Sequence, residues 1–348
     1  MPREQYSFCS EPHASKVRNN FLFQLLPHSA DEKAGRGKMA DKPSRALVLH
    51  GDGLARFIEP SHNHVHSLVC KASCGFLTLP NAPPSESEDE RVVREFAVLL
   101  DACDIDKLGN TAKIPTISER FMGMKAAVIT NNPSLNILGA KLGLTVLKSD
   151  DLIKDVHSFG ELPVDVVASE LLNLLGFKEG KILEKSEYDL VFVHVGNGER
   201  ANGEQNKAVA NDMEYVNALV GDLMQIAQPG SEISSRLHLS LVMSFGNVTD
   251  DNNTNLSVLI TKDEKKSDLS ALFPRQSYTM RGENPRKDVR HHCPMLIAQW
   301  QDGVTRKDMA QAFSFKDFKE HGGNLAIPGD RFLHEVAFKL WKAPKYGA

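Results

Sequence analysis

The stretch YDLVFVHVGNGERA, residues 188–201, joins a run of apolar residues directly to a polar loop that contains two glycines. A segment in which apolar residues recur every three or four positions follows over residues 207–227, which predicts an amphipathic helix. A strand that passes through a loop into a helix is typical of open α/β sheets, where ligands bind at the ends of strands. We therefore expect chemistry in or near the loop from His194 to Gly203.

Five other short apolar runs bounded by turn residues predict further buried strands, at residues 45–50, 125–130, 144–148, 238–244 and 294–300. Helical patterns lie between them, for example over residues 134–143 and 163–176. Because strands and helices alternate, the sequence predicts an α/β fold with a mostly parallel sheet that is covered on both faces.

The organisation along the chain suggests one large domain. A chain of 348 residues with 41% hydrophobic residues can bury an extensive core. The beginning of the chain is polar, mixed in charge and without a clear period. We therefore expect a flexible N-terminal extension over residues 1–43 and the folded domain over residues 44–345.

Composition limits the partners and the compartment. A net charge of -4 gives no basic excess for nucleic acid or an anionic membrane, so neither is expected as a partner. No apolar run approaches the ~20 residues of a membrane helix. The five cysteines are an odd, scattered set, which indicates free thiols in a reducing compartment and predicts a cytoplasmic protein.

Two strand ends carry candidate metal ligands. Asp52 follows the first predicted strand, where a carboxylate can present oxygen atoms to a metal ion, although Asp52 and Gly53 could also simply form a turn. His194 and Glu199, after the strand at 189–195, could bind metal or transfer protons. The alternative for His194 is a histidine whose hydrogen bonds are satisfied at the strand end.

Three further segments carry polar groups with an open role. The acidic, proline-containing stretch 81–91 predicts a surface loop, and Ser85 in it could act as a nucleophile if a metal or base activates it, or simply belong to a solvated loop. Basic and metal-binding side chains precede the last strand, where they could hold a phosphate or a metal or form a surface turn: Arg290, His291 and His292. The HNHVH motif at 62–66 favours a helix with exposed histidines over a metal site.

With these segments in order, the chain resembles the alkaline phosphatase superfamily, and it looks most like the archaeal-type cofactor-independent phosphoglycerate mutases. The resemblance covers about residues 45–345 and lies in the order of the blocks. The blocks that are similar to those of the family are HGDGLAR (50–56), HVHSLVCKASCGFLTLPNAPP (64–84), the segment 114–146, YDLVFVHVGNGERA (188–201) and the segment 313–340.

The resemblance implies a three-layer α/β/α sandwich whose site holds two manganese or zinc ions and a serine that takes up phosphate. Position by position, Asp52 matches the first metal aspartate, Ser85 the nucleophile, and Glu199 a second metal aspartate. In this scheme His194 and His291 would complete the metal site, and Arg290 with His292 would bind substrate.

The chain also departs from the family pattern. Gly203 stands where the family has a histidine, and Ser244-Phe245-Gly246 stands where an Asp-His pair is expected. A dinuclear site needs about six or seven protein ligands, so these losses weaken it at both ions. The sequence therefore favours a divergent member with lost or strongly altered catalysis that binds a small phosphorylated molecule or a protein partner. The alternative is a metal-dependent phosphotransferase or phosphohydrolase that acts through Ser85.

Overall fold

The computed structural model describes residues 43–102, 115–148, 163–196, 205–248, 256–258, 280–281, 284–323 and 326–344. Nearly all of the predicted N-terminal extension, and the candidate ligand Glu199, lie outside these ranges. Within the described residues, no helix has the length and apolar character that are needed to cross a membrane.

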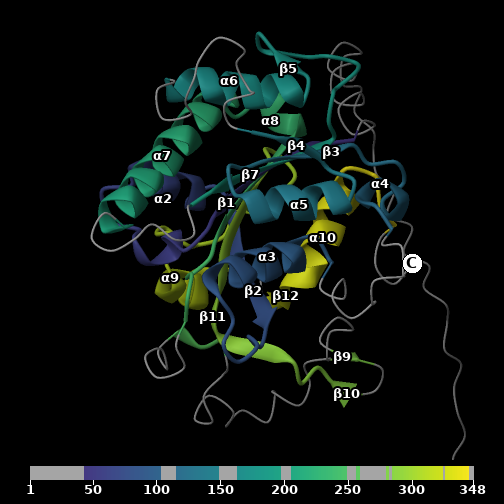
Figure 1. Cartoon of the computed structure of the whole chain (residues 1–348). Helices are drawn as coiled ribbons and strands as arrows, with labels where there is room; N and C mark the ends of the chain where they lie inside the picture. The colour runs from purple at the N-terminus through teal and green to yellow at the C-terminus, as the bar shows by residue number, and fades with distance from the viewer. Residues whose placement is uncertain are drawn as a thin grey trace, which may run out of the picture. The chain divides into compact units, whose positions relative to one another are not determined.

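A central sheet of eight strands organises the described part of the chain (Figure 1). From edge to edge, its strands are β12 (Ala326–Pro328), β2 (Ser73–Pro80), β11 (Val289–Trp300), β8 (Leu237–Met243), β1 (Arg45–Gly51), β7 (Leu190–Val195), β3 (Ala126–Ile129) and β4 (Thr145–Leu147). Strand β11 runs antiparallel to both of its neighbours, and the other pairs are parallel. The mostly parallel sheet that the sequence predicts is therefore confirmed.

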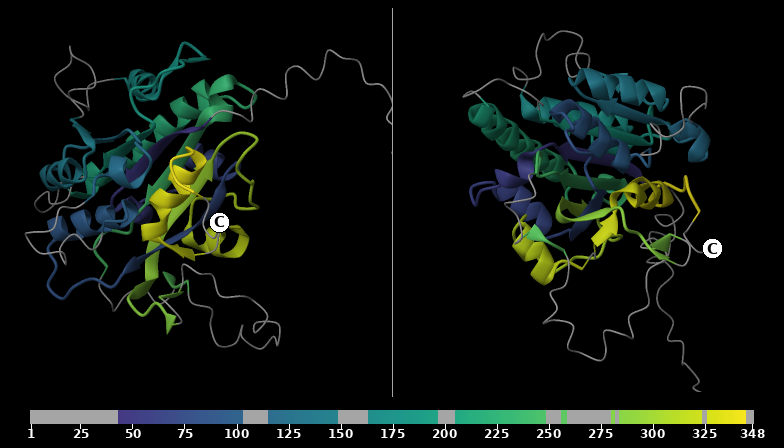
Figure 2. Two further views of the ribbon diagram at one scale, coloured as in Figure 1. Left: turned by 90° about the vertical axis from the view of Figure 1, so that its right-hand side faces the viewer. Right: turned by 60° about the horizontal axis from the view of Figure 1, so that its bottom comes forward.

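Helices cover both faces of the sheet and complete the three layers (Figures 1 and 2). One face packs against α2 (Asn63–Val69), α6 (Val164–Leu174), α7 (Gln205–Ile226), α8 (Glu232–Arg236) and α9 (Phe315–His321). The other packs against α3 (Glu88–Leu99), α4 (Ile117–Arg120), α5 (Pro133–Lys141) and α10 (Phe332–Lys339). Short elements lie around these layers: η1 (Leu54–Arg56), η8 (Gly329–Arg331), the pair β5 (Phe177–Lys178) and β6 (Lys181–Ile182), and the pair β9 (Met280–Arg281) and β10 (Asn284–Pro285).

The alternation of side chains along each strand divides the core in two. In β8, Leu239 and Leu241 belong to the core on the α7 side, and Val242 belongs to the core on the α10 side. His238 and Ser240 therefore share the face of Val242. Asp52 directly follows β1, whereas His238 pairs in register with Ala46 near the start of that strand. The two polar positions thus lie at opposite ends of the parallel strands.

The prediction of a surface loop over residues 81–91 is wrong in its last part, because α3 begins at Glu88. Ser87 caps this helix through a capping box: the Glu90 backbone N–H donates to the Ser87 hydroxyl, and the Ser87 backbone N–H donates to the Glu90 carboxylate at 2.9 Å. The acidic residues that resemble a solvated loop are the first turn of a helix.

Two local expectations about the histidine-rich segments also change. The helix over the HNHVH motif is confirmed by α2, but His62 is buried instead of exposed, with its Nδ1 accepting from the Glu59 backbone N–H. Arg290 belongs to strand β11 and not to a turn before it. The pairing of β11 with β2 shifts register between Arg290 and Met295, which is how the strand carries this extra length.

Candidate functional site

The carboxylate of Asp52 is fixed by close packing at the ends of β1 and β7. The Asp52 backbone N–H donates to the Val195 carbonyl at 2.8 Å. Gly196 has a φ of 129°, and a Cβ there would lie 2.8 Å from the Asp52 carbonyl oxygen. Only glycine allows this approach, so the glycine of the loop after β7 serves to position Asp52.

Arg91 of α3 binds Asp52 in a two-pronged ion pair. Its Nη1 donates to Asp52 Oδ1 at 2.9 Å and its Nη2 to Asp52 Oδ2 at 2.8 Å. Nη1 also donates to Glu95, and Nε and Nη2 donate to Glu88. All five guanidinium N–H donors therefore have carboxylate acceptors, with no donor left for solvent or ligand. The hydrogen bonds to Glu88 and the charge of Asp52 hold the pKa of Arg91 above its usual value, against the effect of burial.

Ser244 supplies a further hydrogen bond to the same carboxylate. Its hydroxyl donates to Asp52 Oδ1 at 2.9 Å and accepts from the Gly53 backbone N–H at 2.9 Å. A carboxylate has about four lone-pair positions, and Arg91 and Ser244 together use three of them. Burial alone would raise the pKa of Asp52, but the charge and hydrogen bonds of Arg91 outweigh it and lower the pKa to about 2.

The residues at Asp52 do not fit the manganese or zinc pair of the resembling family. A metal ion here would meet a carboxylate that is already engaged and would lie beside the Arg91 guanidinium, which carries the same sign of charge. Among the described residues, no group of three or more histidine, cysteine or acidic side chains is placed to hold an ion. The positive charge of the Arg91 guanidinium neutralises Asp52, as a bound metal ion would do.

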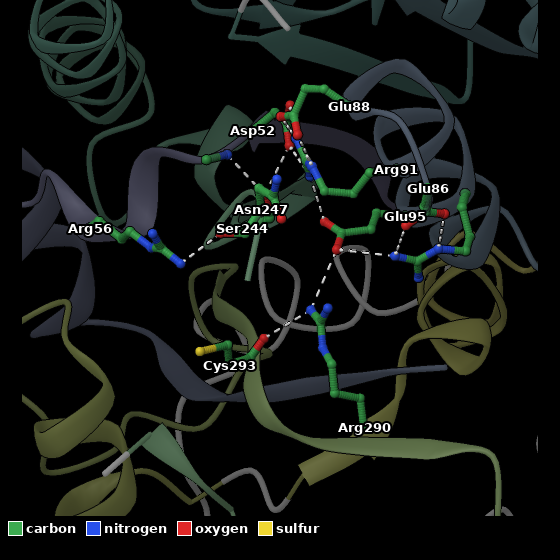
Figure 3. A network of polar contacts seen from close by, with 12 residues as sticks. Asp52, Arg56, Glu86, Glu88, Arg91, Glu95, Ser244, Asn247, Arg290 and Cys293 are labelled. Carbon is green, nitrogen blue, oxygen red and sulfur yellow. Dashed lines mark hydrogen bonds and ion pairs between the residues drawn. The ribbon is translucent and has the colours of Figure 1, made fainter. Parts of the chain in front are cut away.

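A buried network of ion pairs extends from Asp52 across the site (Figure 3). Glu95 connects Arg91, at 3.0 Å, with Arg290 on β11, at 3.4 Å, and Arg94 pairs with Glu86 at 2.6 Å. Burial raises the pKa of Glu95, although the neighbouring arginines oppose the rise. The network thus ties α3 to two strands of the sheet, β11 directly and β1 through Asp52.

A cavity of about 580 Å³ borders this network, and we call it the arginine cavity. Its lining includes three of the residues that the sequence nominates, Ser85, Arg290 and His292. Asn247 and Arg91 line it as well. Ser85 is exposed and has a φ of 63°, a left-handed conformation that is uncommon for serine and frequent at functional sites. The nominated nucleophile and substrate-binding residues therefore meet at one place.

The nominated ligand His194 does not line the arginine cavity, but it lies near enough to Asp52 for the charge of each side chain to shift the pKa of the other. His194 is buried, and its Nδ1 lies 3.1 Å from the Thr130 hydroxyl. Its buried Nε2 has no hydrogen-bond partner among the described residues, so the alternative of a fully satisfied histidine is confirmed only at Nδ1. Burial lowers the pKa of His194, and it lowers that of the neighbouring His50 to about 3. His291 is half-buried on β11 and does not line the arginine cavity.

Sequence reasoning missed Arg91 and Ser244, which hydrogen-bond the Asp52 carboxylate, and Glu95, which pairs with Arg91. A signal for Arg91 and Glu95 was present: Ser87 with Glu90 is a capping-box pattern, and it precedes an apolar run. A helix that begins there places Arg91 and Glu95 four residues apart on one side. The pairing with Asp52 is a long-range contact that no local pattern indicates.

No known family profile and no curated protein matches this sequence. Solved structures do match: the lipoteichoic acid synthase LtaP of Listeria monocytogenes has 11% identity and a TM-score of 0.50, over 88% of this chain and 74% of that chain. A protein of the alkaline phosphatase superfamily from Vibrio parahaemolyticus has 10% identity and a TM-score of 0.40, over 76% and 61%. With its mostly parallel eight-stranded sheet between two helical layers and its likeness to LtaP, the chain has an alkaline-phosphatase-like fold.

The cofactor-independent phosphoglycerate mutase of Thermoplasma acidophilum is also similar, with 11% identity and a TM-score of 0.34 over 65% of this chain and 40% of that chain. At these identities the likeness to the alkaline-phosphatase-like neighbours concerns the scaffold. The narrower resemblance to the mutases, and the roles it implies for individual residues, stay predictions.

Proposed function

We propose that this protein binds a small phosphorylated molecule in the arginine cavity and does not transfer its phosphoryl group through bound metal ions. The observation that carries the proposal is the bidentate pair between Arg91 and Asp52. The resemblance to the alkaline phosphatase superfamily implies that Asp52 would hold a metal ion. Here its charge is already neutralised by a side chain of the same protein.

Arg290 is the group best suited to receive a phosphate. It is 6% exposed, lines the cavity, and its buried Nε has no hydrogen-bond partner among the residues that the structure describes. A buried donor without an acceptor costs free energy, and a ligand oxygen would satisfy it. Arginine is also the side chain that recognises phosphate best, because its planar set of donors matches phosphate oxygens.

The acidic side chains at the cavity do not prevent anion binding. Glu86 is paired with Arg94, and Glu88 is paired with Arg91. Glu95, which forms an ion pair with Arg290, has a raised pKa. Protonation of Glu95 would break this ion pair and leave the positive charge of Arg290 available to a ligand. Binding of an anion would then be accompanied by proton uptake at Glu95. Ser85 and Asn247 offer neutral polar groups to the rest of the ligand.

The test is calorimetric titration of the full chain with inorganic phosphate, glycerol phosphate and a nucleoside monophosphate. We expect saturable binding of at least one phosphate ester, weakened about tenfold or more by Arg290→Gln because a charged hydrogen bond contributes roughly 1.5–3 kcal/mol. Lys141→Gln, an exposed charge change at the end of α5, serves as the matched control and should bind like the wild type. Thermal unfolding of both variants checks that each is folded.

Two results would contradict the proposal. Binding that is unchanged in Arg290→Gln would remove the cavity from consideration. Release of phosphate from an ester that requires added manganese or zinc, and that is lost in Ser85→Ala, would favour the metal-dependent phosphohydrolase instead.

A further inference from the structure

A second cavity, of about 520 Å³, lies on the α10 side of the sheet. Apolar side chains form much of its lining, among them Leu77, Ile297 and Phe332. Polar groups also line it, including Gln299 near the end of β11 and Lys339 at the end of α10. Because His238 marks the starts of the parallel strands, this cavity is separate from the arginine cavity at their carboxyl ends. We call it the lysine cavity.

Lys339 is held by a buried polar cluster on β8 and β11. Its Nζ lies 3.5 Å from His238 Nε2. His238 Nε2 also lies 3.3 Å from the Ser240 hydroxyl and 3.3 Å from Gln299 Nε2. The ammonium and the amide nitrogen can only donate, so Nε2 is the acceptor of His238 and Nδ1 carries its proton. Burial, with the Lys339 charge, keeps the pKa of His238 well below its usual value. The histidine is therefore neutral, and its Nε2 accepts a hydrogen bond that positions Lys339 Nζ.

The surroundings of Lys339 disfavour its charged form. Burial lowers the pKa of Lys339 to about 8, and Glu335, one turn earlier on α10, opposes the shift only in part. The other charged group in the lining is Arg306, and it is already engaged by Asp308 at 3.1 Å. At neutral pH a lysine with such a pKa has on the order of 100-fold more free amine than an ordinary lysine.

We propose that Lys339 is a nucleophilic amine that forms a reversible imine with a small carbonyl compound bound in the lysine cavity. The apolar lining suits a ligand with a short hydrocarbon part, and Lys339 lines the same cavity together with the polar Gln299. Desolvated lysines in apolar pockets act as nucleophiles of this kind in carbonyl chemistry.

The proposed step balances without any further reactant. The lone pair of Lys339 Nζ attacks the carbonyl carbon, and the C=O bonding pair moves to the oxygen, which takes a proton from the nitrogen. The carbinolamine then loses its hydroxyl group and the remaining nitrogen proton as water, which leaves the C=N bond.

The test is reductive trapping of the imine on the full-length protein with butanal and sodium cyanoborohydride, whose hydride reduces the C=N bond to a stable secondary amine. Peptide mapping by mass spectrometry gives a rate for each lysine. We expect Lys339 to be alkylated at least tenfold faster at pH 7 than the exposed Lys141, with a rate that rises to a plateau around a midpoint near pH 8.

Two comparisons distinguish a specific carbonyl-binding site from a lysine that is merely accessible to reagent. Glu335→Gln removes the group that raises the lysine pKa, so trapping at Lys339 should become faster at pH 7. The preference for Lys339 over Lys141 should be larger with butanal than with formaldehyde, because only butanal has a chain for the apolar lining. Labelling of Lys339 no faster than Lys141, or a rate that ignores Glu335→Gln, overturns the proposal. Lys339→Arg, which keeps the charge, assigns the modified peptide.

Discussion

At the scale of single residues, Arg91 explains why the strand-end aspartate is a poor ligand for a metal ion, because it neutralises the carboxylate and occupies both of its oxygens. It satisfies Asp52, Glu88 and Glu95 at once from inside the protein. Because three carboxylates pair with this one guanidinium, its removal leaves all three of them without that counter-charge.

Arg91→Ala should therefore lower the free energy of unfolding by about 3–5 kcal/mol, since it leaves buried carboxylates without a counter-charge. Urea unfolding measures this loss. Adding Asp52→Asn to Arg91→Ala should restore part of it, because one of the unpaired charges disappears. A loss below about 1 kcal/mol would show that the ion pair contributes little. Arg56→Ala, whose side chain donates to the exposed Asn247 carbonyl, is the control.

The lowered pKa of Asp52 predicts a specific acid response. The carboxyl has a pKa of about 2 in the folded state against an ordinary pKa of 3.8, so its stabilisation is fully present above pH 4 and is lost as the pH falls towards 2. The difference corresponds to roughly 2 kcal/mol. Urea midpoints measured from pH 5 to pH 2 should fall more steeply for the wild type than for Asp52→Asn. Parallel curves would contradict the assignment.

At the scale of elements, helix α3 presents Arg91 and Glu95 to the site, and its start is defined by the capping box of Ser87 and Glu90. Ser87→Ala should cost about 1 kcal/mol of stability and leave the fold intact. Thermal unfolding detects this, with Ser169→Ala, an exposed position within α6, as the matched control. Equal midpoints for the two variants would mean that the cap is not used.

The strands were the predictable elements. Buried parallel strands are mostly apolar on both faces, so β1, β3 and β7 appear in the sequence as nearly continuous apolar runs. These strands, and β8 with its two polar residues, fall within a residue or two of their predicted bounds. The start of α3 was hidden because its first turn consists of acids that follow prolines. That composition is shared by helix N-termini and by solvated loops, and only the serine-to-glutamate spacing distinguishes them.

The sequence nominated part of the site from local patterns. Asp52 was nominated because it follows a strand, Ser85 because it lies in an acidic stretch, and Arg290 with His292 because they precede the last predicted strand. The last three share a cavity. The Arg91–Asp52 pair joins residues 39 apart, and the Ser244–Asp52 pair joins residues 192 apart. Such contacts depend on which strands become neighbours, and that information is not contained in a local pattern.

At the scale of the whole molecule, folding should not depend on divalent metal. The charges that hold the ends of β1 and β11 against α3 belong to the protein's own side chains. The thermal midpoint should therefore be unchanged by a chelator, and added manganese or zinc should not raise it. Differential scanning fluorimetry on protein purified without chelator, with elemental analysis, provides the measurement. One or two ions per chain, absent from Asp52→Ala, would contradict the metal-independent site.

The position of β11 has a consequence for biosynthesis. This strand lies between β2 and β8, yet it is made after both. A nascent chain that ends before Val289 can form the β8–β1–β7–β3–β4 part of the sheet, but β8 then has an apolar open edge and β2 has no partner that links it to the rest. We therefore expect the ribosome-bound intermediate to expose an apolar strand edge, which favours association with other chains, until residues 289–300 emerge.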